Sequence, residues 1–347
     1  MTSLGTLTLD GSALGAPVPA VVKTEPASSG EPALRVTDLS VRRGSVALVE
    51  NTSLSVAKGE TLCLVGESGC GKSLTCTAIM GIIDAPLAAD GSIQIMGREI
   101  AGLPERRLKG VRGRDVAIIF QDPMAALNPI QRVGAQVAEI LSVHGTTSAA
   151  EQSREVLALF ERVGLPDPAR QARAYPHQLS GGMCQRVMIA MAIACRPKVL
   201  IADEPTTALD VTIQAQILRL LRELQDDTGM AIVFVTHDLG VVAEIADRVA
   251  VMYSGRIVEE ADVDEIFDAP RHPYTRALMA CRVGTGEPGT ALPAISGSVP
   301  APSARPNGCA FAPRCDHAGP LCLVQPALTE RGTSGVWVAC HHLEEAQ

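Results

Sequence analysis

Short apolar runs recur along the chain, and longer stretches with helical spacing separate them. Four of these runs, at 61–65, 116–120, 199–202 and 231–236, contain few polar residues. Such runs are typical of strands that are covered on both faces of a sheet. Two earlier segments, "ALRVTDLSV" from Ala33 and "SVALVENTSLSV" from Ser45, are also strand-like.

The stretches between the apolar runs favour helices. A helix is predicted from Lys72 to Ile83, and residues 132–195 have a mostly helical pattern. A further helix over 211–224 carries five apolar residues on one side at helical spacing, namely Ile213, Ile217, Leu220, Leu221 and Leu224. Because strands alternate with helices, the pattern predicts an α/β fold with a largely parallel, helix-covered sheet.

The pattern divides the chain into three parts. Residues 1–32 are rich in Ala, Gly, Pro, Ser and Thr, and we expect a flexible leader there. The alternating pattern extends from Ala33 to about Val258. Beyond it, residues 263–280 predict two short helices, residues 283–308 predict a linker or meandering loop, and the end of the chain carries clustered cysteines.

Charge and hydropathy exclude several classes of protein. The 347 residues carry a net charge of −8, which argues against a nucleic-acid partner and against direct adsorption to an acidic lipid surface. No apolar run approaches the roughly 18 residues of a membrane span, and the N-terminus does not have the order of a secretion signal. If the protein acts at a membrane, other subunits must cross it.

The chain has 10 cysteines, and their placement does not suggest a disulfide framework. Cys63 lies in a predicted buried strand, Cys70 in a glycine-rich loop, and Cys76 on the helix that follows. These positions suit reduced thiols in a cytosolic enzyme.

The stretch "GESGCGKS" fits the phosphate-loop pattern G-x-x-x-x-G-K-[ST] between a predicted strand and a predicted helix. Its glycines let backbone N–H groups turn toward phosphate oxygens, and the first turn of the helix adds further donors. Lys72 can reach the β- and γ-phosphates, and the Ser73 hydroxyl can bind Mg²⁺. The predicted ATP-binding residues of the loop are Gly66, Glu67, Ser68, Gly69, Cys70, Gly71, Lys72 and Ser73.

A second motif, "VLIADEP" at 199–205, ends a predicted buried strand with two carboxylates. Burying both without a cation is costly. Asp203 is therefore expected to hold the magnesium shell, and Glu204 to orient and polarise the attacking water.

The motif "LSGGM" at 179–183, placed before "VLIADEP", resembles the signature of the ATP-binding cassette (ABC) family. The resemblance implies that Ser180, Gly181, Gly182 and Met183 complete the ATP site of a second ATPase subunit in a head-to-tail dimer. A serine followed by glycines at the start of a helix offers several N–H donors to an anion.

Three more segments resemble ABC landmarks in the expected order. Gln121 in "IIFQDP" matches the residue that contacts Mg²⁺ or water and relays the nucleotide state to membrane subunits. Asp210 in "ALD" matches a residue expected at the dimer interface, and His237 in "VFVTHD" matches a histidine expected to bond the γ-phosphate. The resemblance implies a P-loop NTPase of ABC type over 33–258, with a RecA-like mixed sheet, an antiparallel β part and a helical subdomain at about 122–195.

Two positions depart from the family pattern. The family usually has an aromatic residue upstream of the loop that stacks on adenine, whereas this chain has "SVRRGSV", so Arg43 or a neighbour must substitute. Arginine planes can stack on aromatic faces. Cys184 follows the signature where a polar or basic residue is common. It either reflects tolerance of a small side chain or provides a thiol whose pKa is lowered at a helix N-terminus.

Other segments resemble the oligopeptide, dipeptide and nickel importer branch of the family. They are "QDPMAALNP" at 121–129, "HPYTRAL" at 272–278 and "GCAFAPRC" at 308–315, the last typical of the C-terminal domain of peptide members. The resemblance implies a C-terminal domain over 259–347 and favours peptides as cargo. Nickel or another small solute is the alternative.

The C-terminal cysteines have the spacing C-x5-C-x6-C-x17-C, at Cys309, Cys315, Cys322 and Cys340. This spacing does not fit the C-x2-C pairs of a zinc ribbon. Four thiolates suit an iron–sulfur cluster, and resemblance to peptide-importer ATPases makes [4Fe–4S] the first choice. Reduced structural cysteines and zinc are the alternatives, and His317, His341 and His342 are further candidate ligands.

The resemblance implies an ATPase subunit, with ATP and Mg²⁺, that powers peptide import. Its partners are expected to be a second, related ATPase, two transmembrane permease subunits and an extracytoplasmic peptide-binding protein. It is expected to be peripheral, on the cytoplasmic face of the cell membrane. The rival hypotheses are a soluble ABC ATPase of DNA repair or translation, which usually has two cassettes or a coiled-coil insertion, and a redox-sensing module.

Overall fold

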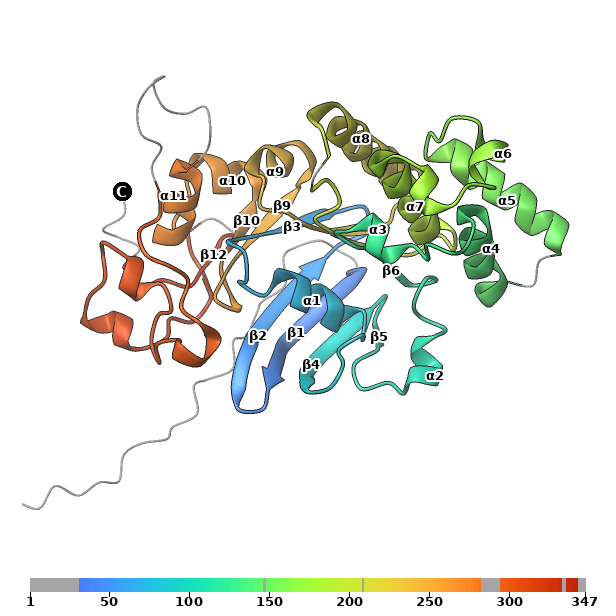
Figure 1. The fold of residues 1–347 in the computed structure, drawn as a ribbon. Helices are drawn as coiled ribbons and strands as arrows, with labels where there is room; N and C mark the ends of the chain where they lie inside the picture. Colours follow the sequence, from blue (N-terminus) through green and yellow to red (C-terminus); the bar gives the residue numbers. More distant parts are fainter. Residues whose placement is uncertain (1–30, 146–147, 208, 282–293, 333–334, 343–347) are drawn as a thin grey trace, which may run out of the picture.

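The computed structural model describes residues 31–145, 148–207, 209–281, 294–332 and 335–342. An α/β core lies in the middle of the molecule, with an antiparallel sheet beneath it, a helical part at one end and the C-terminal part at the other (Figure 1). The chain starts the described part in the antiparallel sheet and ends it in the C-terminal part.

The main sheet has eight strands in the order β11-β12-β10-β9-β3-β8-β7-β6. Their bounds are β3 Thr61–Val65, β6 Val116–Ile119, β7 Val199–Asp203, β8 Ala231–Val235, β9 Arg248–Tyr253, β10 Arg256–Asp262, β11 Thr329–Glu330 and β12 Trp337–Val338. The strands β6, β7, β8, β3 and β9 are parallel neighbours, and β10, β12 and β11 continue the sheet in antiparallel pairing. The sheet is therefore mixed, as predicted.

The side chains of the parallel strands point alternately to the two covered faces of the sheet, which explains why these strands have so few polar residues. In β3, Cys63 and Val65 join the core on one face, whereas Leu62 and Leu64 join the core on the other. All five residues of β3 are buried. Successive side chains of a strand point to opposite faces, so a strand covered on both sides must be apolar throughout.

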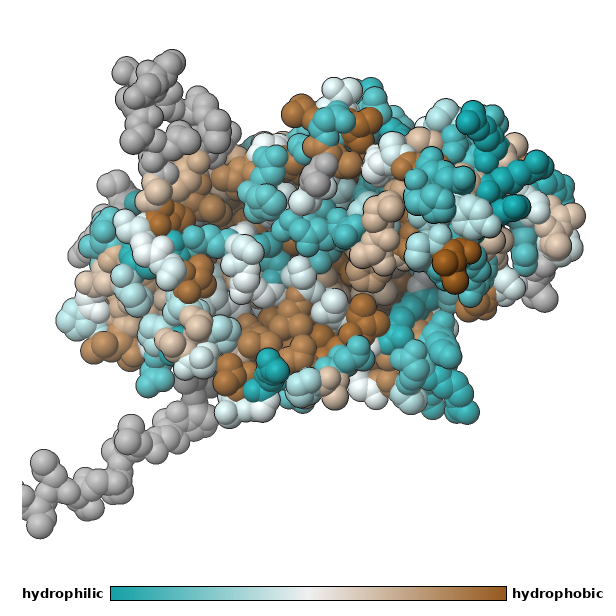
Figure 2. Space-filling view, viewed as in Figure 1, coloured by the Kyte–Doolittle hydropathy of each residue, from teal (hydrophilic) through white to brown (hydrophobic). Residues whose placement is uncertain are grey.

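One face of the sheet is covered by α1 Lys72–Ile79 and by a second, antiparallel sheet of order β2-β1-β4-β5. This sheet contains β1 Leu34–Arg43, β2 Val46–Val56, β4 Leu87–Ile95 and β5 Arg98–Glu99. The short helix α2 Glu105–Leu108 follows it. An apolar groove of about 340 Å³ lies where α1 meets β4, and the space-filling view shows hydrophobic residues there (Figure 2).

The helical part is formed by α3 Pro123–Ala126, α4 Val133–His144, α5 Ala149–Arg162, α6 Pro168–Gln171, η1 Pro176–Gln178 and α7 Gly181–Ile193. These elements span residues 123–193. Ser148 begins α5 with a capping box, since its side chain accepts from the N–H of Glu151 while Glu151 bonds back to Ser148. The helices α8 Val211–Thr228 and α9 Leu239–Ile245 lie above the main sheet in the view of Figure 1.

Two helix ends differ from the sequence prediction. The helix predicted to reach Ile83 ends at Ile79, and Gly81 follows in the left-handed conformation at φ 65°. The helix predicted to end at residue 224 continues to Thr228, where Gly229 caps it at φ 65°. Glycine adopts this conformation without strain and commonly ends helices. Ile213, predicted on the apolar side, is only partly buried.

The C-terminal part, residues 259–347, is called the extension below. It contains α10 Val263–Asp268 and α11 Pro273–Ala280, which match the two helices predicted there, and the 3₁₀ turns η2 Pro302–Ala304, η3 Ala312–Arg314 and η4 Pro320–Leu323. The predicted boundary at 258 lies within β10, and β12 of the extension pairs with that strand. The extension is thus continuous with the main sheet.

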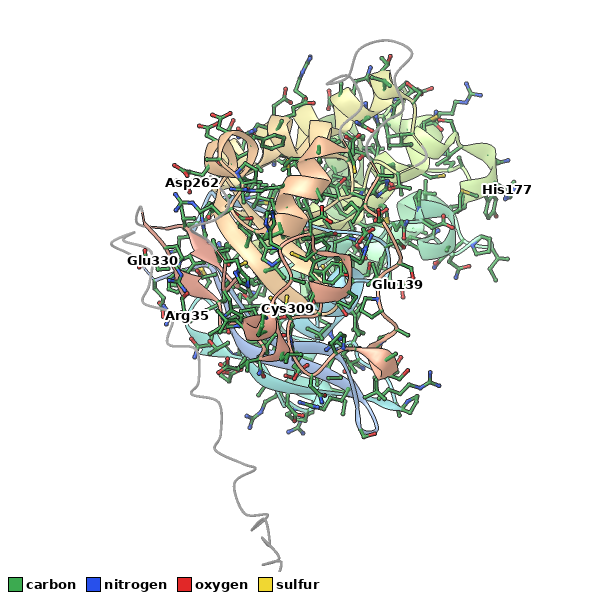
Figure 3. The ribbon with its side chains drawn as sticks, turned by 90° about the vertical axis from the view of Figure 1, so that its left-hand side faces the viewer. Arg35, Glu139, His177, Asp262, Cys309 and Glu330 are labelled. Carbon is green, nitrogen blue, oxygen red and sulfur yellow. The ribbon has the colours of Figure 1, made fainter. Side chains whose placement is uncertain are left out.

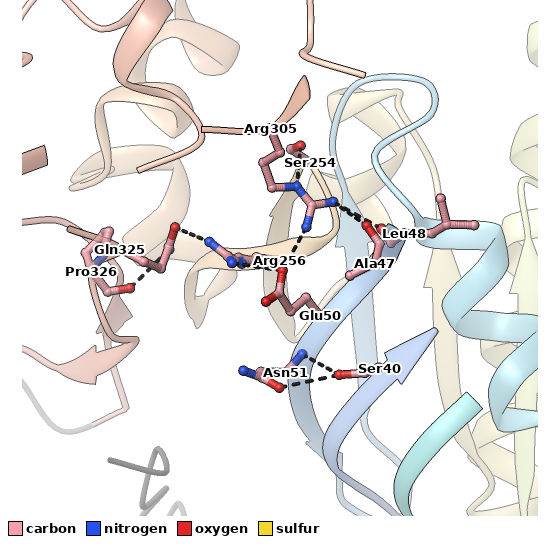
Figure 4. Close-up of polar contacts among 10 residues, drawn as sticks. All are labelled: Ser40, Ala47, Leu48, Glu50, Asn51, Ser254, Arg256, Arg305, Gln325 and Pro326. Atoms are coloured by element: carbon pink, nitrogen blue, oxygen red, sulfur yellow. Dashed lines mark hydrogen bonds and ion pairs between the residues drawn. The ribbon is translucent and has the colours of Figure 1, made fainter. Parts of the chain in front are cut away.

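Two arginines attach the extension to β2 (Figure 4). Arg305 donates to Glu50 Oε2 at 2.9 Å and to the carbonyl oxygen of Ala47 at 3.1 Å. Arg256 donates to Glu50 Oε2 at 2.8 Å and also bonds Gln325. The Arg305 side chain is only 6% exposed, so these acceptors replace the water that would otherwise solvate its charge.

Candidate nucleotide site

The predicted site residues gather at the carboxyl ends of four parallel strands. The phosphate loop follows β3, Gln121 follows β6, Asp203 ends β7 with Glu204 directly after it, and His237 follows β8. These strands are neighbours in the order β3-β8-β7-β6. Ligands of open α/β sheets bind outside the carboxyl ends of the strands, and the fold therefore places these side chains where a ligand would be expected.

Glycines determine the shape of the phosphate loop. Gly66, Gly69 and Gly71 have φ values of 152°, 78° and 109°, which side chains rarely adopt. A Cβ on Gly66 would also collide with the carbonyl oxygen of Met252 on β9. The loop leads directly into α1, so its N–H groups and those of the first helical turn can point at one anion.

Lys72 is buried, with 6% of its surface exposed. Its Nζ donates to the carbonyl oxygens of Gly66 at 2.8 Å and Glu67 at 3.2 Å, and it lies 3.8 Å from Cys70 Sγ. Burial raises the pKa of the Cys70 thiol, although the charge of Lys72 opposes that rise. Cys70 is therefore a buried, neutral thiol within the loop.

Ser73 and Asp203 lie together, as the magnesium role predicted for them requires. Ser73 Oγ donates to Asp203 Oδ1 at 3.1 Å. Burial raises the pKa of Asp203, the bond from Ser73 opposes that rise, and the charge of Glu204 adds to it. A buried carboxylate with a raised pKa gains from a nearby cation, because the cation favours the charged form.

Glu204 is the centre of a polar cluster. Its carboxylate accepts from Gln121 Nε2 at 3.1 Å and from Thr207 Oγ1 at 2.9 Å, and its Oε1 lies 3.3 Å from His237 Nδ1. The residue has φ 48°, a left-handed conformation that is unfavourable for non-glycine residues. The sequence predicts Gln121 and His237 as site residues, whereas no sequence motif marks Thr207 in "EPTTALD".

The signature residues lie elsewhere. Ser180 caps α7 by accepting from the N–H of Met183 at 3.3 Å, and Asp210 caps α8 by accepting from the N–H of Ile213 at 3.0 Å. Ser180, Gly181, Gly182, Met183 and Asp210 line one hollow of about 390 Å³. No residue of the phosphate loop is among its lining residues, all of which belong to the described part of the chain. The signature of one chain therefore lines a different hollow from the phosphate loop of that chain.

Two departures from the family pattern have different outcomes. Arg43, the predicted adenine contact, ends β1 with its side chain exposed. Cys184 is fully buried, donates to the carbonyl oxygen of Pro176 at 3.5 Å, and has its pKa raised by burial. The lowered pKa considered for Cys184 is wrong, because desolvation disfavours a thiolate there.

The four C-terminal cysteines line one small cavity, together with His317, His341 and His342. Figure 3 looks onto the extension and labels Cys309 within it. Burial raises the pKa of Cys309, Cys315 and Cys340. The cavity measures about 10 Å³, which is about the room that one water needs. Within the described residues, no three or more His, Cys, Asp or Glu side chains are grouped so that they could hold a metal ion. The four cysteines predicted to hold the cluster thus lie near one another, but they are not arranged as the ligands of a metal ion.

Two family profiles match the chain. One, described as "ABC transporter", matches residues 49–207, and one described as "Oligopeptide/dipeptide transporter, C-terminal region" matches residues 258–322. Among the described residues, no helix is both long enough and apolar enough to cross a membrane.

Curated relatives resemble the chain over most of its length. The dipeptide transport ATP-binding protein DppD of Escherichia coli is 47% identical over 315 residues, covering 89% of this chain and 96% of the relative. The DppD proteins of Haemophilus influenzae and Bacillus subtilis are 49% and 46% identical, covering 94% and 92% of those relatives and 89% and 87% of this chain.

Solved cassettes share the fold. The ATP-binding cassette MJ0796, solved as a dimer bound to ADP and Pi, matches with a TM-score of 0.60 and 27% identity, over 66% of this chain and 98% of that chain. The protein cbiO1 of Clostridium perfringens, part of the cbiONQ transporter complex, matches with a TM-score of 0.60 and 28% identity, over 69% of this chain and 92% of that chain.

Proposed function

This chain belongs to the family of ATP-binding subunits of dipeptide and oligopeptide ABC transporters, and on that basis we propose that it powers uptake of short peptides by hydrolysing ATP. The observation that carries the proposal is the convergence of the phosphate loop, Asp203, Glu204, Gln121 and His237 at adjacent strand ends. The extension supports peptides as the cargo, because its sequence matches the C-terminal region of oligopeptide and dipeptide transporters.

Each residue of the site has a role that follows from its chemistry. The loop N–H groups and Lys72 hold the β- and γ-phosphates. Ser73, Asp203 and Gln121 supply the oxygen donors that suit Mg²⁺, which neutralises phosphate charge when bound. A water oxygen bonds to the γ-phosphorus, the bond to the β–γ bridging oxygen breaks, ADP keeps that electron pair, and Glu204 takes the proton of the water. His237, 3.3 Å from Glu204, donates to the γ-phosphate.

ATP is bound between two subunits in this proposal. The hollow formed by Ser180, Gly181 and Gly182 supplies N–H donors at the start of α7 but lies apart from the loop of its own chain. A second ATPase subunit, a related chain in this branch, therefore completes the site, with Asp210 at the interface. The cassette MJ0796 solved as a dimer supports this arrangement.

The membrane partners are two permease subunits, which the chain meets at the cytoplasmic face of the membrane without crossing it. Three residues close to Gln121 in the sequence, Phe120, Met124 and Ile130, have apolar side chains that are 40%, 47% and 85% exposed. Exposed apolar side chains that gather in a patch are typical of protein contacts. A rearrangement around Gln121 on ATP binding would move these side chains and so the permeases. An extracytoplasmic peptide-binding protein delivers the cargo to them.

Arg43 is the proposed adenine contact.

Uptake by a strain that lacks this chain tests the function. We expect that a plasmid copy of the wild type restores uptake of a labelled dipeptide and that Lys72→Ala does not, although both proteins accumulate to the same level. The strain is also tested for labelled nickel. Nickel uptake that depends on this chain, with dipeptide uptake unchanged by its loss, would contradict the peptide assignment in favour of the alternative.

Cys309, Cys315, Cys322 and Cys340 are proposed to hold a [4Fe–4S] cluster. The donor set fits such a group in number and kind, and the small cavity requires the thiols to move outward around it. The cluster would cross-link the extension and would take no part in ATP hydrolysis, which occurs in the cassette. Protein purified without oxygen is expected to contain four iron and four sulfide per chain, as the cluster formula states, with a brown colour that Cys315→Ser reduces. A colourless, iron-free preparation contradicts the cluster, and stoichiometric zinc would support the zinc alternative.

A further inference from the structure

The extension contacts the phosphate loop through Arg314 and Tyr274, and both side chains reach Glu67. Arg314 donates to the two carboxylate oxygens of Glu67 at 2.6 and 3.0 Å. The Tyr274 hydroxyl accepts from the Glu67 N–H at 2.9 Å. Only 4% of the Arg314 side chain and none of Tyr274 is exposed. The second residue of the loop is therefore held by its side chain and by its backbone at once.

Glu67 in turn contacts the residues that bind phosphate. Its carbonyl oxygen accepts from Lys72 Nζ at 3.2 Å and from the Cys70 N–H at 3.3 Å. The rest of the loop is rich in glycines with positive φ, and glycine backbones move easily between conformations. A loop of this composition needs partners outside itself to keep one shape, and Glu67 is where the extension supplies them.

The contacts that hold Arg314 are themselves well packed. Its guanidinium lies 5.8 Å from the centre of the Tyr253 ring and donates to the carbonyl oxygen of Ser296 at 2.8 Å. Phe311, three residues before it, packs against the rings of Tyr253 and Tyr274 at 5.2 and 5.4 Å. A bidentate, charge-assisted pair with a carboxylate is both strong and directional. Arg314 is thus placed to fix the orientation of Glu67.

We propose that Arg314 and Tyr274 are positioning residues of the nucleotide site, which hold Glu67 so that the loop N–H groups and Lys72 face the phosphates. The inference rests on the proposed ATP-binding function and deepens it, because it assigns part of the affinity for ATP to the extension. Arg314 and Phe311 lie between Cys309 and Cys315. The segment that carries the cysteines is therefore the same one that supports the loop.

The affinity of the full-length chain for Mg²⁺-ATP, measured by calorimetry, tests the inference. Arg314→Ala is expected to weaken binding about tenfold, as typical couplings between sites do, and Arg314→Lys to restore part of that loss. Tyr274→Phe keeps the ring packing and removes only the hydroxyl, so about a fivefold loss is expected from the unpaired N–H. Because Tyr274→Phe is the milder change, it decides the question if Arg314→Ala does not fold.

Arg256→Ala is the matched control. It removes an arginine that also attaches the extension, through Glu50 and Gln325, and that has no contact with Glu67 among the described residues. We expect it to lower the unfolding temperature while ATP affinity stays within about twofold of the wild type. Unchanged affinity in both Arg314→Ala and Tyr274→Phe, or an equal loss in Arg256→Ala, would overturn the inference. A wild-type chain that binds ATP no better than Lys72→Ala would instead contradict the proposed function.

Discussion

Glu204→Gln is expected to lower ATP turnover by about 10³-fold, within the range that general-base catalysis contributes, while ATP still binds. The amide keeps the size of the carboxylate and can still accept from Thr207 and Gln121, but it cannot take a proton from water. Because binding depends on the loop, on Lys72 and on the magnesium donors, that part of the site is unchanged. Closed dimers are therefore expected to accumulate with ATP.

The rate of ATP turnover and the molecular mass in solution together check this prediction. Phosphate release is measured for the wild type, for Glu204→Gln and for Glu155→Gln, an exposed carboxylate of α5 that serves as the control. Light scattering with ATP then reports whether the subunits stay associated. Wild-type turnover in Glu204→Gln would show that another group accepts the proton, and the role given to Glu204 would be wrong.

Ser180→Arg is expected to reduce hydrolysis at the partner's ATP site by about 10²-fold, the usual effect of losing one donor to a developing charge. The long side chain would fill the hollow at the start of α7, where the γ-phosphate of the ATP on the partner's loop is proposed to bind. ATP binding to the loop of the same chain is expected to be unchanged, because that loop does not line the hollow.

A Lys72→Ala background isolates this effect. In a complex of Lys72→Ala with a wild-type second ATPase, the remaining hydrolysis occurs at the partner's loop, which the signature of this chain completes. Adding Ser180→Arg should then lower that hydrolysis by about 10²-fold, whereas adding Glu155→Gln should not. Persistent hydrolysis in the Ser180→Arg complex would mean that the signature does not act across the interface.

The gathering of the candidate catalytic residues at one sheet edge was predictable from the sequence, because each belongs to a short motif that ends or follows an apolar strand. Lys72, Asp203 and His237 needed only the inference that parallel strands end at one edge of a sheet. The helices between 123 and 193 and the two helices of 263–280 were predicted for a similar reason, since helical spacing and prolines mark them locally.

The contacts around Glu67 and Glu204 were not predictable in this way. Arg314 and Glu67 are 247 residues apart, and no local pattern joins them. The "HPYTRAL" motif indicated the lineage, but that its tyrosine accepts from the loop follows only from how α11 packs. The raised pKa of Cys184 likewise depends on burial. The early end of α1, by contrast, has a local signal in Gly81.

The central claim is that one chain holds two halves of different ATP sites, and turnover per chain across a dilution series tests it most directly. Light scattering on the same samples gives the fraction that is associated. The account predicts that turnover per chain falls in proportion to the associated fraction and vanishes in a verified monomer. A monomer that hydrolyses ATP as fast as the concentrated protein would contradict it.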